Sequence, residues 1–171
     1  MDYLEPRFHP AVVEFEKFVA DREGYRRALE EWLRYSWRWA RVDKYRLVFK
    51  IQAAALRAIR EFLDRQGFTE VLPPIIGPVT DPGIRGARQA AIDFYGREYK
   101  VMSSAILYKQ YMAASLGKIY FISPNVRLEP PDSIYTGRHL VEFVQVDVEM
   151  LGADYHKAME VAEGLVAYVV R

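Results

Sequence analysis

The chain has 171 residues, of which 51% are hydrophobic and 27% charged, so it is long enough to bury a hydrophobic core. Its net charge of +1 gives no global field that would draw it to nucleic acid or to a membrane. No apolar run approaches the ~20 residues that span a bilayer, and no secretory signal follows Met1. Without cysteine, disulfides, thiolate catalysis and cysteine metal sites are excluded. We therefore expect a cytoplasmic protein with no membrane partner.

Residues 11–40 are predicted to be helical, with a break near Gly24. This stretch contains all three tryptophans of the chain, Trp32, Trp37 and Trp39. One interpretation is a helix that packs these aromatic side chains on a core. The other is a surface that binds a partner. We treat residues 1–44 as a helical N-terminal extension.

Residues 45–66 give the clearest helix prediction, because apolar side chains recur on one stripe and Gly67 follows as a stop signal. The stripe consists of Leu47, Ile51, Ala54, Ala58 and Phe62. The segment "FTEVLPPII" is predicted to be a short strand that ends at Pro73 and Pro74, since proline belongs at strand ends and edges. Residues 77–91 are rich in proline and glycine, which indicates a loop, either a surface connector or a mobile lid.

The remaining elements predict a fold of the α+β class. A hairpin is expected to turn at Gly96–Arg97. The segment "SSAILYKQYMAASLG" is predicted to be a helix that Ser103 or Ser104 caps and Gly117 ends. The strand "KIYFI" and a last amphipathic helix over 154–170 follow. Because hairpins require antiparallel pairing, this order predicts a mostly antiparallel sheet flanked by helices.

Polar and apolar residues alternate in the region 125–150, which is predicted to be a second hairpin. Alternate residues of a strand share a face, so Asn125, Arg127 and Glu129 project together. The following strand has two faces. The polar one carries Phe143, Gln145, Asp147 and Glu149, and the apolar one carries Val144, Val146, Val148 and Met150. The apolar face is expected to cover the core, and the hairpin places the two polar faces side by side.

A sheet face exposed to water would show the same alternation. However, Phe143 on a polar face has no structural reason, whereas a planar ligand could stack on it. Arg138 and His139 in the connecting loop suit anionic oxygens. Arg127 beside Glu129 suits an anion next to an amine donor. An adenine nucleotide supplies the phosphates, the ring and the amine together.

The segment "NVRLE" followed by "TGRHLVEFVQVDVEM" resembles motif 2 of class II aminoacyl-tRNA synthetases, in the aspartate/asparagine branch. "SSAILYKQ" is similar to the branch's substrate helix, and "GFTEVLPPII" is similar to motif 1, with Pro74 at the motif's proline. The resemblance covers residues 45–170. It implies that residues 45–171 form the N-terminal half of a class II catalytic domain, with motifs 1 and 2 but without motif 3.

The resemblance also implies a nucleotide site. Arg127 would be the catalytic residue, because it would hold the α-phosphate and the substrate carboxylate and stabilise the pentacovalent phosphorus. Glu129 would accept the adenine amino group, and Phe143 would stack under adenine. His139, helped by Arg138, would hold the outer phosphates.

The implied amino-acid site contains Lys109, Asp147 and Ser104. Lys109 would pair with the side-chain carboxylate of the substrate, and Asp147 would bind its amino group. Ile106 stands where the family has a glutamine that helps to read the amino acid. No side chain acts as a nucleophile, because the substrate carboxylate attacks ATP and positioning does the work.

Two departures from the family pattern shape the functional hypothesis. The first 44 residues are too short and too helical for the anticodon-binding OB-fold. The half that carries motif 3 and the acidic Mg²⁺ ligands does not follow Arg171. ATP and Mg²⁺ are therefore expected as cofactors, with no metal ligand among the residues of this chain and the ligands expected in the missing half.

This combination resembles a smaller archaeal group, the asparagine synthetases related to asparaginyl-tRNA synthetase. It implies activation of aspartate by ATP as aspartyl-adenylate, transfer to ammonia to give asparagine, and a homodimer formed through motif 1, over residues 45–76. Without an anticodon domain, tRNA is not expected as a partner. Two alternatives stay open. One is a paralogue, fragment or split subunit of an aspartyl- or asparaginyl-tRNA synthetase that acts in tRNA aminoacylation. The other is a non-catalytic module that binds nucleotide or amino acid.

Overall fold

The computed structural model describes residues 20–81, 86–130, 133 and 139–171. The chain divides into two compact units. The first comprises residues 1–54 with 132–138, and the second comprises 55–131 with 139–171. The predicted site residues other than Arg138 belong to the second unit.

The first unit contains helix α2 (Arg22–Arg34), the short helix α3 (Ser36–Trp39) and the beginning of α4 (Asp43–Arg65). The predicted break near Gly24 is present at Asp21, which lies between the helical residues Ala20 and Arg22. Gly24 itself lies inside the first turn of α2, where its backbone N–H donates to Asp21 Oδ1 at 2.8 Å. A further interruption falls at Tyr35, between α2 and α3. Residues 11–19 of the predicted helix lie outside the described residues.

Helix α4 ends where the sequence predicts, in a Schellman motif. Gly67 has φ +77°. Its N–H donates to the carbonyl of Asp64 at 3.0 Å, and the N–H of Phe68 donates to the carbonyl of Leu63 at 3.0 Å. A left-handed residue is needed at this position, and glycine adopts it without steric cost. The same turn buries Phe68 against Leu63, so the end of the helix is also part of the core.

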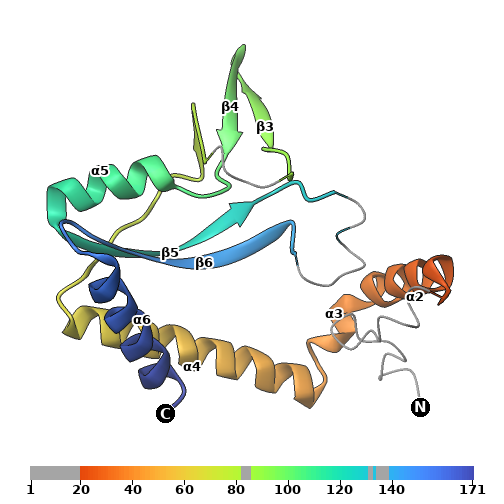
Figure 1. Cartoon of the computed structure of the whole chain (residues 1–171). Helices are drawn as coiled ribbons and strands as arrows, with labels where there is room; N and C mark the ends of the chain where they lie inside the picture. Colours follow the sequence, from red (N-terminus) through yellow and green to blue (C-terminus); the bar gives the residue numbers. More distant parts are fainter. Residues whose placement is uncertain (1–19, 82–85, 131–132, 134–138) are drawn as a thin grey trace. The chain divides into compact units, whose positions relative to one another are not determined.

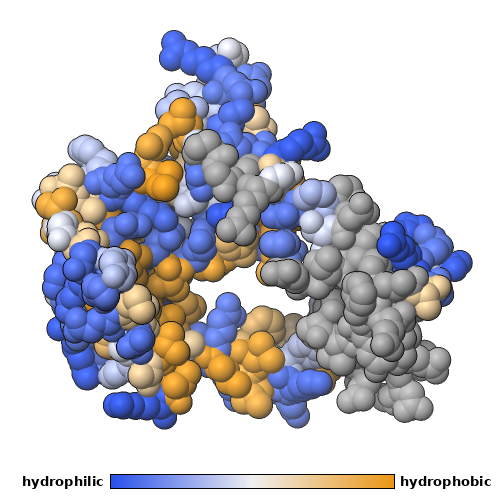
Figure 2. Space-filling model, in the orientation of Figure 1, coloured by the Kyte–Doolittle hydropathy of each residue, from blue (hydrophilic) through white to orange (hydrophobic). Residues whose placement is uncertain are grey.

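The predicted apolar stripe of α4 has two different environments. Phe62 packs against the core of the second unit. Leu47 and Ile51, nearer the start of the helix, are 56% and 58% exposed. Hydrophobic side chains along α4 are visible at the surface in Figure 2. The periodicity therefore predicted the helix correctly, but within the chain only its C-terminal part is covered.

The main sheet of the second unit has the order β1 (Thr69–Glu70), β5 (Lys118–Val126) and β6 (Glu142–Met150). β1 is parallel to β5, and β5 is antiparallel to β6, which lies at one edge. β1 is much shorter than the predicted strand. Its ladder stops after Val71, whose N–H donates to the carbonyl of Tyr120, and the following prolines have no N–H to continue it.

A second sheet has the order β2 (Ile76–Gly77), β4 (Arg97–Val101) and β3 (Ala91–Phe94), all antiparallel. The β3–β4 hairpin turns at Tyr95 and Gly96, which have φ of 53° and 77°. Positive φ at both central residues is the requirement of a type I′ turn. The turn thus begins one residue earlier than the predicted Gly96–Arg97.

Helices α5 (Ile106–Leu116) and α6 (Tyr155–Val169) lie on opposite faces of the β5–β6 hairpin (Figure 1). Gly117, with φ +82°, ends α5 as predicted. The predicted cap of α5 is wrong, because the helix starts at Ala105 without a side-chain cap. No helix in the described part of the chain is long and apolar enough to cross a bilayer.

The two faces of the hairpin contribute to different cores. On one face, Val146, Val148 and Met150 pack against α6 and the C-terminal part of α4, as the alternation predicts, and Val144 is 59% exposed. On the other face, Ile119 and Phe121 of β5 pack against α5. The polar residues of β6 share this second face, so they lie on the α5 side. The sheet class expected from the sequence, α+β with mostly antiparallel pairing, is confirmed.

Tyr120 joins three elements through its hydroxyl. The ring is buried against Leu63 and Phe68, and the hydroxyl lies 3.1 Å from Asp64 Oδ1 and 3.0 Å from Glu70 Oε2. Burial and these two carboxylates raise the pKa of Tyr120. Arg60 completes the network with an ion pair to Glu70 at 3.1 Å, and this hydrogen bond holds the pKa of Glu70 below its usual range.

We expect Glu70→Gln to lower the free energy of unfolding by about 1 kcal/mol at pH 7, because it removes the ion pair with Arg60. A carboxyl group with a lowered folded pKa stabilises the fold above its unfolded pKa of about 4.3, and the contribution is lost as the pH falls through the folded value. The difference between wild type and variant should therefore shrink below about pH 4. Urea unfolding across this range measures it, with Glu61→Gln on the surface of α4 as the control. A difference that is constant with pH would contradict the assignment.

Candidate active site

Arg127 directly follows β5 and is held at three points. Its backbone N–H donates to the carbonyl of Val141 at 2.8 Å. Its Nε donates to the carbonyl of Ser103 at 3.0 Å. Its Cζ lies 5.1 Å from the centroid of the Phe143 ring. The two terminal nitrogens make no hydrogen bond to another described residue. A guanidinium that is oriented through Nε and keeps its outer nitrogens available is suited to bind anionic oxygens.

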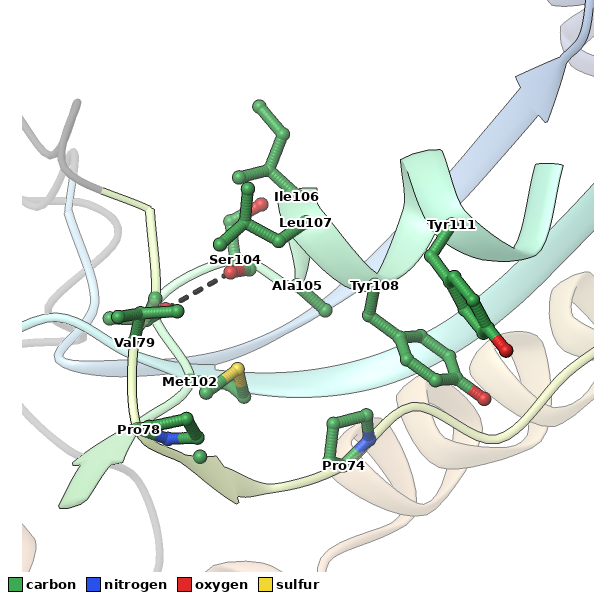
Figure 3. A pocket seen from close by; sticks show the side chains of 12 residues that line it. Pro74, Pro78, Val79, Met102, Ser104, Ala105, Ile106, Leu107, Tyr108 and Tyr111 are labelled. Carbon is green, nitrogen blue, oxygen red and sulfur yellow. Dashed lines mark hydrogen bonds between the residues drawn. The ribbon is translucent and has the colours of Figure 1, made fainter. Parts of the chain in front are cut away.

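The carbonyl that orients Arg127 is itself fixed by a buried polar cluster. The backbone N–H of Ser103 donates to Thr80 Oγ1 at 3.0 Å, and the two hydroxyls lie 3.1 Å apart. Thr80 Oγ1 also donates to the carbonyl of Ser104 at 3.0 Å, the bond drawn in Figure 3. Both serines precede Ala105, which occupies the N-cap position of α5, and their backbone groups bind Thr80 instead.

Phe143 stands opposite Asn125 in the β5–β6 register. Asn125 is fully buried, and its Nδ2 donates to Gln145 Oε1 at 3.0 Å and to the carbonyl of Ser123 at 3.3 Å. Asn125 Oδ1 and Ser123 Oγ are buried without a hydrogen-bond partner among the described residues. Each such atom costs about 1–3 kcal/mol when it remains unpaired. A hydrogen-bond donor that reached this part of the sheet face would remove that cost.

Lys109 of α5 and Asp147 of β6 form a buried ion pair. Lys109 Nζ lies 2.7 Å from Asp147 Oδ1 and 3.8 Å from Glu149 Oε1. The side chains of Lys109 and Asp147 are only 10% and 12% exposed. Asp147 Oδ2 is buried and has no partner among the described residues. The pair therefore combines a buried ammonium with a carboxylate oxygen that can still accept a hydrogen bond.

These contacts place four of the predicted site residues in two groups on the α5 side of the hairpin. Arg127 and Phe143 form one group, and Lys109 and Asp147 form the other. The sequence did not predict that Lys109 and Asp147 bind each other. It also missed Thr80, Ser103 and the buried amide of Asn125. The alternation places Asn125 on this face, but only the three-dimensional contacts show that it is buried.

The other predicted residues have looser surroundings. The backbone N–H of Glu129 donates to the carbonyl of Arg127 at 2.8 Å, and its side chain is half-buried with no hydrogen bond to a described residue. His139 is exposed. Arg138 lies outside the described residues. Ser104 is buried beside Thr80, and none of its hydrogen bonds in the described part of the chain reaches Lys109 or Asp147.

A cavity of about 280 Å³ lies between the start of α5 and the segment 74–80 (Figure 3). Most of its lining is apolar and comes from two sides, with Pro74, Pro78 and Val79 on one and Ile106, Leu107, Tyr108 and Tyr111 on the other. Ile106 lines this cavity, whereas Lys109 and Asp147 do not. The position at which the family resemblance puts a glutamine therefore belongs here to a different, apolar surface of α5.

Within the described residues, no three histidine, aspartate or glutamate side chains are arranged to hold a metal ion. Asp147 and Glu149 come close together, but both are near the ammonium of Lys109, which opposes a cation there. These described residues therefore do not fit Mg²⁺.

Comparison with known proteins places these features in context. The family model described as tRNA synthetases class II (D, K and N) matches residues 28–171. The aspartate–tRNA(Asp/Asn) ligase of Thermus thermophilus is 33% identical over 98% of this chain and 37% of its own length. The corresponding ligase of Sulfurisphaera tokodaii is 35% identical over 77% of this chain and 29% of its own.

The fold is similar to the crystal structure of asparaginyl-tRNA synthetase from Pyrococcus horikoshii complexed with asparaginyl-adenylate. The TM-score is 0.75 at 30% identity, over 82% of this chain and 31% of that protein. The chain thus spans about a third of the length of these relatives. The family resemblance seen in the motifs and the expected fold class are both confirmed.

Proposed function

Because the chain belongs to the class II tRNA synthetases of the D, K and N type, we propose that it binds ATP and aspartate side by side and activates aspartate as aspartyl-adenylate. The observation that carries the proposal is the arrangement of two charged groups on one sheet face, Arg127 with Phe143 and Lys109 with Asp147. Since the chain spans only 37% of the Thermus relative, the activity of the whole protein is part of the proposal.

The Arg127 group is proposed to bind the nucleotide. Adenine stacks on Phe143, and its amino group donates to Glu129. The terminal nitrogens of Arg127 bind the α-phosphate, because Nε already anchors the side chain to Ser103. His139 binds the outer phosphates. An arginine fixed before the reaction can stabilise the charge of the pentacovalent phosphorus without reorganising.

The Lys109 group is proposed to bind aspartate. The ion pair between Lys109 and Asp147 is replaced by two ion pairs to the substrate, one from each residue. The side-chain carboxylate of the substrate pairs with Lys109, and the substrate ammonium pairs with Asp147 through Oδ2, the oxygen that has no partner among the described residues. Asparagine offers Lys109 a neutral amide in place of a carboxylate, so it loses the ion pair in a buried place. Ser104 is the remaining predicted contact of the amino acid.

The chemistry needs no nucleophile from the protein. An oxygen of the α-carboxylate of aspartate forms a bond to the α-phosphorus of ATP. The bond from that phosphorus to the bridging oxygen breaks, and its electron pair leaves with pyrophosphate. The residues of this chain hold the attacking carboxylate oxygen in line with the phosphorus–oxygen bond that breaks. This positioning supplies the larger part of the rate enhancement in such a reaction.

The acceptor of the activated aspartate has two candidates. The relatives from Thermus and Sulfurisphaera are aspartate–tRNA(Asp/Asn) ligases, which favours tRNA. The other candidate is ammonia, with asparagine as the product. Radiolabelled aspartate incubated with ATP and either tRNA or ammonium separates the two. Formation of neither product, with binding intact, would support a non-catalytic module.

A homodimer through residues 45–76 is proposed from the apolar side chains that this region exposes. Leu72 and Ile75 are 84% and 61% exposed. Light scattering should give twice the chain mass of 19.9 kDa. Leu72→Asp should shift the mass toward the monomer, because burying a carboxylate in an apolar interface is costly. Val166→Asp, at an exposed position of α6, should leave the dimer intact. A wild-type chain that stays monomeric at high concentration would contradict the proposal.

Phe143→Ala should weaken AMP binding by about 1–3 kcal/mol, the range measured for loss of a base–aromatic stack. Calorimetric titration with AMP measures the effect. Phe94→Ala serves as the control, because Phe94 is an aromatic residue of the other sheet, β3 of the β3–β4 hairpin. If both variants bind AMP as the wild type does, adenine does not stack on Phe143.

Lys109→Met should abolish aspartate binding and leave AMP binding nearly unchanged, because the nucleotide contacts lie on the β5–β6 hairpin and its loop. Thermal-shift titration with aspartate and with asparagine, each in the presence of AMP, measures it. The wild type should bind aspartate and not asparagine. Lys100→Met is the control, because Lys100 forms a surface ion pair with Glu98. Equal affinity of the wild type for both amino acids would contradict the assignment of Lys109 to the aspartate side-chain carboxylate.

A further inference from the structure

Gln145 lies on the polar face of β6 between the two groups of the candidate site, and the proposed function gives it no role. Along β6 it stands between Phe143 and Asp147. Alternate residues of a strand share a face and are about 6.5–7 Å apart. The side chain of Gln145 is half-buried. Gln145 therefore occupies the sheet face at the place where the nucleotide group ends and the amino-acid group begins.

The orientation of the Gln145 amide is fixed by two hydrogen bonds that begin at the backbone. The carbonyl of Ser123 can only accept, so the Asn125 atom that lies 3.3 Å from it is the donor Nδ2. The same Nδ2 donates to Gln145 at 3.0 Å, so the Gln145 atom that receives this bond is the acceptor Oε1. Gln145 consequently directs its other branch, Nε2 with two N–H donors, away from Asn125.

The donors of Gln145 Nε2 are available to a ligand. Within the described part of the chain, the side chain of Gln145 takes part in no hydrogen bond other than the one from Asn125. An amide whose oxygen is anchored and whose N–H groups have no acceptor is suited to bind a carboxylate or carbonyl oxygen.

Packing alone does not account for the buried amide of Asn125. This side chain is fully buried, yet its Oδ1 has no partner among the described residues. An unpaired buried acceptor destabilises a fold, whereas an apolar side chain of the same shape would fill the space without that cost. The bonds that Asn125 does make are those that orient Gln145. Orientation of Gln145 thus explains a residue that stability does not.

The charges of the proposed complex identify the substrate atom that lies nearest this amide. The substrate ammonium is proposed to pair with Asp147, and the α-phosphate of ATP is proposed to bind Arg127. In aspartate, the group between the ammonium and the attacked phosphorus is the α-carboxylate. One of its oxygens attacks the phosphorus, and the other is free to accept a hydrogen bond from the sheet.

We propose that Gln145 Nε2 donates to this second oxygen of the α-carboxylate, and that Asn125 is the positioning residue that directs Nε2 toward it. The inference rests on the proposed function, because it concerns the same aspartate site. Once the attacking oxygen is bonded to phosphorus, the held oxygen is the carbonyl oxygen of aspartyl-adenylate, so the hydrogen bond persists from substrate to product. It also distinguishes the two carboxylates of aspartate. Lys109 holds the one in the side chain, and Gln145 turns the other toward the phosphorus.

Two stable analogues of aspartyl-adenylate test this hydrogen bond in the 171-residue chain. Aspartyl-sulfamoyl adenosine keeps the carbonyl oxygen, and aspartol adenylate has a CH₂ group in place of the carbonyl. In calorimetric titrations, Gln145→Met should weaken binding of the carbonyl analogue about tenfold, in the range for loss of one hydrogen bond. It should leave binding of the CH₂ analogue nearly unchanged. Each variant is compared with the wild type on the same ligand, so the different linkers of the analogues cancel.

Asn125→Leu tests the positioning role, because leucine has the shape of asparagine but lacks the donor that orients Gln145. It should also weaken binding of the carbonyl analogue and spare the CH₂ analogue. In the Gln145→Met background it should have no further effect, since Asn125 acts through Gln145. If Asn125→Leu does not fold, Asn125→Ala replaces it with the same expected results.

Val146→Ala is the matched control on the same strand. Val146 faces the opposite core, so its truncation should lower the melting temperature and leave the affinities for both analogues nearly unchanged. A melting temperature measured for every variant separates loss of the fold from loss of the hydrogen bond. If Val146→Ala weakens binding of the carbonyl analogue alone, as Gln145→Met should, the effect does not come from the amide and the inference is overturned.

Failure of this inference and failure of the proposed function give different results. A wild type that binds neither analogue overturns both. A wild type that binds both analogues, with Gln145→Met weakening the two equally or not at all, overturns the role of Gln145 and leaves the proposed function standing. If the losses from Asn125→Leu and Gln145→Met add in the double variant, Asn125 does not act through Gln145, and its positioning role is overturned.

Discussion

The register of β6 against β5 is the constraint on which the candidate site depends. It pairs Asn125 with Phe143 and Phe121 with Asp147, so that the polar residues of β6 lie on the same face as α5. A slip by one residue would turn every side chain of β6 to the other face. The apolar side of the same strand prevents this slip, because Val146, Val148 and Met150 are packed against α6 and α4. The hydrophobic core therefore positions the charged site that lies on its opposite side.

The ion pair of Lys109 and Asp147 both holds α5 on the sheet and carries the charges of the proposed aspartate site. Two buried charges are expensive to remove from water, and each compensates the other only while both are present. A zwitterionic substrate that pairs with both partners at once would replace this one ion pair by two. The same pairing that holds α5 on the sheet would then present both charges that the proposed aspartate site requires.

The sequence predicted the elements that depend on local pattern. Periodicity located α4 and its glycine stop, and strict alternation located the β5–β6 hairpin and separated its apolar face from its polar one. It did not predict contacts between residues distant in the chain. Thr80 binds the backbone of Ser103 and Ser104, and α5 begins after them with Ala105 at the N-cap position, so the expected cap does not form. Lys109 and Asp147 were each identified from the family motif, but a linear pattern does not show that one neutralises the other.

β6 also presents a long open edge, since in the described part of the chain its nine residues pair only with β5. Such an edge can template the addition of another strand. A parallel, in-register copy of β6 would stack Asp147 and Glu149 on their own duplicates, and like charges in adjacent strands repel. These like charges therefore oppose the addition of a parallel, in-register copy of β6 at this edge. They leave it accessible to a strand of different sequence, so the polar face that forms the site also limits which strands can extend the sheet.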